Sequence, residues 1–550
     1  MTPRNLLSFL LLSLAFAPIT LAQEIKPATV DDPAAAADSL YKSGKLDDAA
    51  KQYEALLTGD PKMFHARAGL MRIRLKQQRV DNAYELGKAG MAMPGFTAEL
   101  IAEMGNVHFR RGEMGQAGDD YFHAERVDPK IVGAYLGLSR LYSAYSMHRK
   151  AYDQLKTALE VAPNDPAVQR MWFRMLPLKE RLRAVEDYLS SPHPDDESET
   201  KSLREYSEYL KATVDKPVHA CRMISKVEQT QTPLKYLMRD ATHLRGFGLQ
   251  VKLNDHVNNL LLDTGASGIV IGRKAAERAG LERVANQSLG GIGDKGLQEG
   301  YLAVAKRIRI GELEFEDCMV SVSDRTSIVD EDGLIGSNVF SSYLVGIDGP
   351  GYMLRLSSLP RRPDEVKVAT ALNTDVEKAD EGEDAKTEQD AAKKVELRLP
   401  KDRYIAPEMA NWSKVFRFGH QLLIPTHVND SPSMLFVIDT GSFSNMLSTS
   451  AARKVSKVYQ DDRYTVTGLN GKVNDVYIAE KAKLQFSRFA LDNQNAVTID
   501  LSSLSRHNGT EVSGLLGFTL LRLLDMKIDY RDGLVDFSYD PKRLPAFMRE

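Results

Sequence analysis

Two aspartates of this sequence, Asp263 and Asp439, occupy the same unusual position, because each ends an apolar run and is followed directly by Thr-Gly. The apolar run predicts a buried strand. An unpartnered carboxylate is costly to bury, so a carboxylate at the end of such a strand is usually paired or functional. Carboxylates serve as general acids and bases, which makes both aspartates candidate catalytic residues. The loop residues that follow them are candidates as well: Thr264, Gly265, Thr440 and Gly441.

The elements around the two aspartates repeat in the same order. A strand is predicted over 248–253 in the first copy and over 422–428 in the second, each followed by an Asn-Asp turn and the strand into the aspartate. A Gly-rich hairpin tip follows at 289–294 and at 467–471. The aspartate-to-hairpin spacings are 28 and 29 residues, and the spacings to a later Gly-Leu-Ile/Leu-Gly segment are 73 and 78. This matching scaffold indicates a duplicated module rather than a chance tripeptide.

The two modules resemble the retropepsin-like aspartic proteases over about residues 240–358 and 415–540. The residues that carry this resemblance are Asp263–Ala266 with Gly333–Gly336, and Asp439–Ser442 with Gly514–Gly517. The resemblance implies small closed β-barrels that meet with one aspartate from each and hold a substrate under flaps. It assigns the flaps to Gly290, Gly291, Ile292 and Gly293 in the first module, and to Gly468 and Leu469 in the second.

The chemistry of a carboxylate pair fits this resemblance. Two carboxylates in hydrogen-bonding range share a proton, so one acts as general base on a water and the other polarises the scissile carbonyl. No metal and no cofactor is expected. By resemblance, Thr264 and Thr440 bond across to the opposite loop. The copies also differ, since Ser267 stands in the first loop where Phe443 stands in the second, and the second hairpin matches a flap less well.

The N-terminal third of the chain is a repeat. Ala49, Ala83, Ala117 and Ala151 recur every 34 residues, and prolines follow nearly the same register. A small residue is needed where two helices approach closely. The pattern resembles the tetratricopeptide repeat, which implies stacked helices that bind a peptide or a protein partner. The alternative is that these helices only brace the downstream modules.

The predicted fold class is multidomain α + β, with an N-terminal α-helical tetratricopeptide solenoid followed by two retropepsin-like closed β-barrel modules. A segment rich in charged residues and Ala separates the modules and predicts a solvated, disordered linker. The predicted divisions are a signal peptide over 1–22, helical repeats over 33–214, module 1 over 240–358, the linker over 361–397 and module 2 over 404–545.

The N-terminus predicts export. Arg4 precedes an apolar core over 6–17, and Thr20–Ala22 offers a small-residue cleavage site. An uncleaved membrane anchor is the alternative, but the apolar run is short for a span. No other segment is long and apolar enough to cross a bilayer, so no stable membrane span is expected after cleavage. The expected location is the periplasm or the exterior.

Composition narrows the function classes. The net charge of −3 over 550 residues shows no bias toward nucleic acid. Two cysteines, Cys221 and Cys318, are too few for a disulfide framework or a thiolate metal site, and the sequence leaves open whether they pair.

Three functional hypotheses follow from the sequence. The first is an exported aspartic endopeptidase that hydrolyses peptide bonds with Asp263 and Asp439 as one dyad, while the helical repeats bind substrate or a partner. The second is a non-catalytic peptide-binding or scaffold protein with degenerate protease modules. The third is that each module pairs with its twin in another chain.

Overall fold

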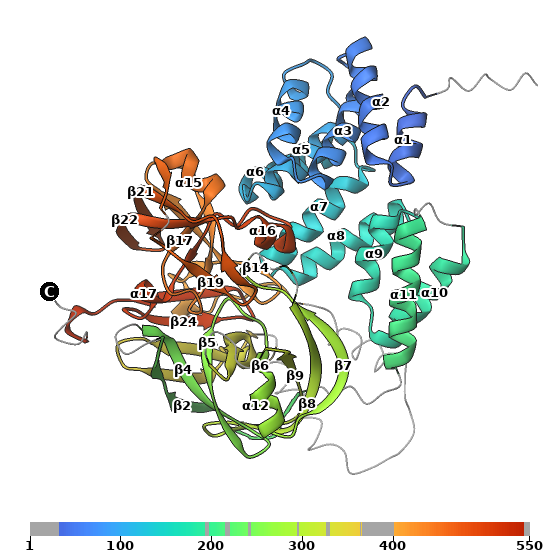
Figure 1. The fold of residues 1–550 in the computed structure, drawn as a ribbon. Coiled ribbons are helices and arrows are strands. Elements are labelled where there is room, and N and C mark those ends of the chain that lie inside the picture. The colour runs from blue at the N-terminus through green and yellow to red at the C-terminus, as the bar shows by residue number, and fades with distance from the viewer. Residues whose placement is uncertain are drawn as a thin grey trace, which may run out of the picture.

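The structure is a computed structural model, and it describes residues 32–192, 197–214, 221–239, 244–293, 296, 298–325, 331–363, 365, 401–461 and 463–543. A row of helices lies beside two β-rich modules (Figure 1). The predicted signal peptide and most of the predicted linker lie outside the described residues.

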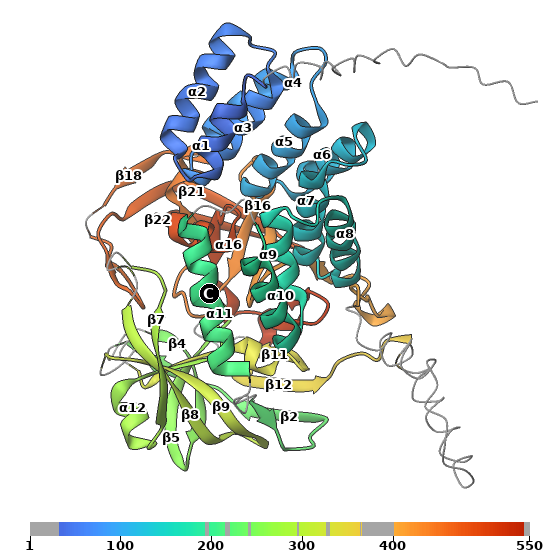
Figure 2. The same ribbon diagram turned by 90° about the vertical axis from the view of Figure 1, so that its right-hand side faces the viewer.

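The helical part is built from paired helices. The 34-residue alanines fall one each in α2, α4, α6 and α8, and all four are fully buried. The ring of Tyr53 lies against Gly69, and that of Tyr121 lies against Gly105 and Gly137, so small residues let the helices approach. The predicted helical solenoid is confirmed, and the helices form a curved row (Figure 2). The helices are α1 (Ala35–Lys42), α2 (Leu46–Gly59), α3 (Phe64–Lys76), α4 (Val80–Met91), α5 (Ala98–Arg110), α6 (Met114–Val127), α7 (Val132–Ala144), α8 (His148–Val161), α9 (Pro166–Met175), α10 (Leu178–Ser190) and α11 (Glu197–Val214).

Module 1 is a closed six-stranded barrel with the ring order β9-β6-β10-β5-β4-β8, closed by pairing of β8 with β9. The short strand β3 lies on β4, and β7 extends β8 into a hairpin. The elements are β1 (Arg222–Met223), β2 (Gln229–Pro233), β3 (Lys235–Met238), β4 (Leu244–Leu253), β5 (His256–Asp263), β6 (Ile269–Gly272), α12 (Arg273–Arg278), β7 (Glu282–Leu289), β8 (Gln298–Ile310), β9 (Leu313–Ser323), β10 (Gly333–Gly336), η1 (Ser337–Phe340), β11 (Tyr343–Asp348) and β12 (Met353–Ser358).

Module 2 closes in the same way, with the six-stranded ring β15-β16-β23-β17-β22-β21 and pairing of β21 with β15. The predicted closed barrels are therefore confirmed in both copies. The elements are η2 (Pro407–Met409), β13 (Ser413–Lys414), β14 (Phe416–Phe418), β15 (Gln421–Val428), β16 (Met434–Ile438), β17 (Met446–Ser448), α15 (Thr449–Val455), β18 (Val458–Gln460), β19 (Val466–Gly468), β20 (Gly471–Val473), β21 (Tyr477–Phe486), β22 (Phe489–Ile499), α16 (Ser502–Asn508), β23 (Gly514–Leu516), α17 (Phe518–Leu521), β24 (Asp525–Asp529), β25 (Leu534–Ser538) and η3 (Pro541–Arg543).

A third sheet joins the two modules. Its strand order is β13-β25-β24-β11-β12-β2, and β11 of module 1 pairs antiparallel with β24 of module 2. The segments before and after the predicted linker both bond to Asp532, which lies between β24 and β25 of this sheet. Arg362 pairs with the Asp532 carboxylate at 2.5 Å, and the backbone N–H of Tyr404 donates to the same oxygen at 2.8 Å. The modules are thus held by paired strands and by these contacts.

The helical repeat packs directly on module 2. The Thr510 hydroxyl donates to the carbonyl of Phe109 at 2.7 Å. The ring of Phe109 lies edge-on to that of Phe418, with ring centroids 6.1 Å apart, and Tyr145 lies edge-on to Phe416 at 4.8 Å. Phe109, Phe416 and Leu435 belong to one buried apolar cluster, and Tyr145 and Phe418 pack against it. This cluster contains residues of both the helical repeat and module 2.

Cys221 and Cys318 form a disulfide, which ties the segment before β2 to strand β9. This settles the question of pairing that the sequence left open. Within the described residues, no helix is long and apolar enough to span a membrane.

Candidate active site

Parallel strand pairing places each aspartate at the end of a buried strand. In module 1, β5 runs parallel to β10, with Asp263 opposite Gly336. In module 2, β16 runs parallel to β23, and the N–H of Asp439 donates to the carbonyl of Leu516 at 2.9 Å. The Gly-Leu-Ile/Leu-Gly segments therefore hold the strands that carry the aspartates. The sequence pattern gives the order of these pieces but not their contact.

Two threonines lock the aspartate loops together across the module interface. The Thr264 hydroxyl donates to the carbonyl of Ile438 at 2.7 Å and accepts from the N–H of Thr440 at 3.0 Å. The Thr440 hydroxyl donates to the carbonyl of Leu262 at 2.8 Å and accepts from the N–H of Thr264 at 3.0 Å. Both threonines are buried. The two loops of one chain therefore face each other around a pseudo-twofold axis.

The carboxyl groups lie between these loops. The N–H of Gly265 donates to Asp263 Oδ1 at 2.8 Å, and that of Gly441 donates to Asp439 Oδ1 at 2.9 Å. Each carboxyl group also lies against the opposite glycine. A methyl group on Gly265 would come within 2.8 Å of Asp439 Cγ, and one on Gly441 would strike the Asp263 carboxyl group. Glycine is required at both positions because the carboxyl groups approach so closely.

The two carboxyl groups share a hydrogen bond and differ in their electrostatic setting. Burial, followed by the nearby Asp439 carboxylate, raises the pKa of Asp263 well above its ordinary value. Burial also raises the pKa of Asp439, but the hydrogen bond from Asp263, backbone N–H groups of its loop and the charge of Arg245 oppose that rise. Both pKa values are therefore raised, and the pair is suited to hold one shared proton.

The two predicted flap tips touch each other. The N–H of Asn470 donates to the carbonyl of Ile292 at 2.9 Å. A methyl group on Gly291 would lie 2.7 Å from Leu469 Cβ, so the two tips are in close contact. Arg325 of module 1 also donates to the carbonyl of Leu469 at 2.9 Å. The tips also contain the other predicted flap residues, Gly290, Gly293 and Gly468.

Each flap tip packs on the opposite module. Leu469 of module 2 lies against an apolar cluster of module 1. Ile292 of module 1 packs against the cluster that module 2 shares with the helices. Because Ala266 of the first aspartate loop also contacts the first cluster, the flap of one module and the loop of the other share one apolar wall.

The sequence did not single out two polar residues beside the first aspartate loop. His420 Nε2 donates to the carbonyl of Gly265 at 3.0 Å, and Gln421 Nε2 donates to the same oxygen at 3.2 Å. His420 ends the turn before β15 and Gln421 is the first residue of β15, at the positions where module 1 has Arg245 and Gly246. The sequence signal available for these residues was the pair of polar side chains at this position of the duplicated module. Their role becomes visible only from the contact between the two modules.

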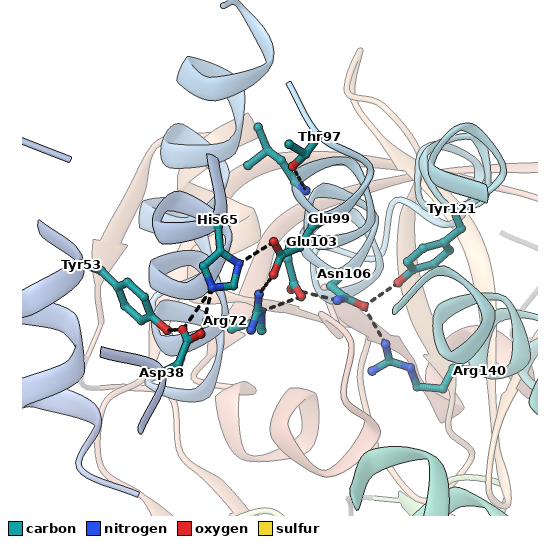
Figure 3. A network of polar contacts seen from close by, with 11 residues as sticks. Asp38, Tyr53, His65, Arg72, Thr97, Glu99, Glu103, Asn106, Tyr121 and Arg140 are labelled. Atoms are coloured by element: carbon teal, nitrogen blue, oxygen red, sulfur yellow. Dashed lines mark hydrogen bonds and ion pairs between the residues drawn. The ribbon is translucent and has the colours of Figure 1, made fainter. Parts of the chain in front are cut away.

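A second polar arrangement runs through the helical repeat (Figure 3). His65 bonds to Asp38 at 3.0 Å and to Glu99 at 2.8 Å, and Arg72 pairs with Glu99 and Glu103. Its other members are Tyr53, Asn106, Tyr121 and Arg140. Hydrogen bonds to the two carboxylates, that of Glu99 before that of Asp38, raise the pKa of His65 to about 9 despite burial. The charged side chains of this network therefore form ion pairs with one another.

One group in the described chain has ligand atoms close enough for a metal ion, namely Asp32, Asp38 and His65, whose atoms lie within 4.8 Å of one another. Asp38 and His65 already bond to each other, and Asp38 accepts from the Tyr53 hydroxyl. These bonds account for the cluster as part of helix packing, so we assign no metal to it.

Comparison with known proteins gives the modules a family. Residues 249–339 and 424–520 each match the family model described as aspartyl protease. The chain therefore carries two regions in tandem that match the aspartyl protease family model, behind a tetratricopeptide-like helical repeat. No curated protein matches the sequence.

Two solved structures are similar to the helical part. A thermophilic TPR protein from Thermus thermophilus is 24% identical, covers 33% of this chain and 97% of that chain, and gives a TM-score of 0.28. The MamA protein is 19% identical, covers 32% of this chain and 84% of that chain, and gives a TM-score of 0.20. The repeat itself is identified by its 34-residue period and its paired helices.

Proposed function

We propose that this protein is an exported aspartic endopeptidase whose Asp263 and Asp439 act as one dyad within a single chain. The observation that carries the proposal is the crossed set of hydrogen bonds that Thr264 and Thr440 each make to the opposite aspartate strand and loop. These bonds hold two buried carboxyl groups in contact, and such a pair is suited to share one proton.

In the proposed reaction, the ionised Asp439 accepts a proton from a water, and the water oxygen attacks the scissile carbonyl carbon. Asp263 gives its proton to the carbonyl oxygen, which yields a tetrahedral diol. Proton transfer from the dyad to the amide nitrogen then allows the C–N bond to break, releasing an acid and an amine. Because the two carboxyl groups share the proton, the assignment of base and acid to the individual aspartates is part of the proposal.

The proposed substrate is a peptide or protein chain held under the two flaps. Leu469 and Ile292 would move from their present apolar contacts when a peptide enters, and would close over it afterwards. A protein partner or the substrate would bind the helical repeats.

Export is proposed from the N-terminal signal pattern over 1–22. The Cys221–Cys318 disulfide supports an oxidising compartment. The periplasm and the exterior both satisfy this condition.

The test is cleavage of a mixed peptide library by the mature protein from acidic to neutral pH, with product identification by mass spectrometry. Asp263→Asn and Asp439→Asn should each lower kcat by about a thousandfold or more, because neither carboxyl group works alone. Asp475→Asn, an exposed aspartate of module 2, is the matched control. Cleavage that survives both dyad substitutions would refute the proposal.

The direct contact between the flap tips is also consistent with a second candidate, a non-catalytic protein whose modules would hold a peptide without cutting it. A pepstatin-like transition-state mimic separates the two. Binding of the mimic without any peptide turnover supports the second candidate. Activity confined to a dimer in sedimentation analysis would instead indicate that modules pair between chains.

A further inference from the structure

The carbonyl oxygen of Gly265 is held by two side chains of the opposite module. His420 donates to it at 3.0 Å and Gln421 at 3.2 Å. The N–H of the same glycine donates to Asp263 Oδ1 at 2.8 Å. Module 2 therefore fixes the loop that orients the aspartate of module 1.

Both side chains are themselves held in place. His420 stands in the turn between β14 and β15, two residues after Phe418, whose ring contacts Phe109 of helix α5. Asn508 Nδ2 donates to Gln421 Oε1 at 2.7 Å. This bond occupies the amide oxygen, so the amide NH₂ group is left to face the glycine carbonyl.

The two lines of contact start from one residue of the helical repeat. The ring of Phe109 packs on Phe418, which leads to His420. The carbonyl of Phe109 accepts from the Thr510 hydroxyl at 2.7 Å, and Thr510 lies two residues after Asn508. The end of helix α5 thus reaches the first aspartate loop by a ring contact and by a hydrogen-bonded segment of module 2.

We propose that His420 and Gln421 are positioning residues for the Asp263 loop and that the end of helix α5, through Phe109, keeps them in place. The helical repeat is then a structural part of the catalytic site as well as a surface for partners. The effect on reaction rate rests on the proposed peptidase function, whereas the effect on the loop itself does not.

The first experiment measures kcat and KM of the full chain. His420→Ala together with Gln421→Ala should lower kcat about tenfold or more with little change in KM, because small misplacement of a reacting group is costly. His420→Gln, with Gln421 left unchanged, keeps an N–H donor at this position and should have a kcat close to that of the wild type. His427→Ala, at an exposed histidine of β15, is the matched control. If kcat falls as far in the His420→Gln variant as in the double Ala variant, the positioning role is overturned.

The second experiment needs no activity. Amide hydrogen exchange is followed by mass spectrometry over peptides that contain residues 260–270, beside thermal unfolding to confirm the fold. The double Ala variant should exchange faster in this loop, and Phe109→Leu, which removes the ring but keeps an apolar side chain, should do so to a smaller extent. The control should match the wild type. Unchanged exchange in the double variant refutes the inference even if the protein is a peptidase, and faster exchange without any turnover supports it while the proposed function fails.

Discussion

The two protease modules share their barrel and their aspartate loop but differ in what covers the outside. Both modules carry a short strand paired with the strand that precedes the aspartate strand, β3 on β4 and β14 on β15, and in module 1 Leu237 packs on Gly248. Module 2 is covered by the helical repeat, where Gly112 lies against Leu435. The parts that carry the site are alike because two copies must meet there. The outer surfaces differ because each copy has its own neighbour.

The largest expected effect comes from breaking the cover of module 2. Leu435→Asp would bury an unpaired charge between module 2 and the helices, so we expect it to cost about 5 kcal/mol or more of the free energy of unfolding. Leu237→Asp, on the half-buried strand of module 1, should cost clearly less. Chemical denaturation of both variants measures the difference. Equal costs would mean that the helices do not support module 2.

Substitution of Thr264 and Thr440 tests whether the two aspartate loops contribute equally to the contact between the modules. Thr264→Val and Thr440→Val each leave a buried N–H and a buried carbonyl without a partner, so each should cost roughly 4 kcal/mol. The two losses should be similar, since the four bonds mirror one another. In a double-mutant cycle the double variant should cost less than the sum. Strictly additive costs would contradict a joint lock.

A second difference between the modules is the Cys221–Cys318 disulfide, which is attached to module 1 through strand β9. Replacing Cys221 and Cys318 together with Ser should lower the free energy of unfolding by about 3 kcal/mol, because the bond closes a loop with a sequence separation of 97 residues. A reducing agent should destabilise the wild type by a similar amount and leave the variant unchanged. A shift of the variant under reduction would point to another cause.

The smallest expected effect is the pH dependence of stability that the two aspartates confer. The pKa of Asp263 is raised in the folded protein well above its ordinary value of 3.8. The stability that its proton contributes is therefore full below pH 3.8 and is lost as the pH rises through the folded pKa. Asp263→Asn removes this penalty, so its stability relative to wild type should improve as the pH rises from acidic to neutral. Asp439→Asn should change in the same direction, since burial also raises the pKa of Asp439. Thermal unfolding across this pH range checks both.

Much of the fold could be predicted because its signals are local. The predicted strand over 422–428 starts one residue after β15 begins, and the predicted strand over 248–253 ends at the last residue of β4. The Asn254 and Asn429 turns adopt the left-handed backbone conformation that asparagine tolerates. The 34-residue alanines marked the helix pairs, since a small residue is needed at each close contact.

The sequence by itself determined that two aspartates end buried strands before a Thr-Gly turn, because apolar runs and turn residues act over a few positions. Only the tertiary structure decided which carboxyl groups meet, whether Cys221 and Cys318 pair, and what His420 holds. Those outcomes depend on contacts between residues far apart in the chain. Asp263 and Asp439 lie 176 positions apart, and a spacing of that length fixes no direction in space until strands of both modules pair in one sheet.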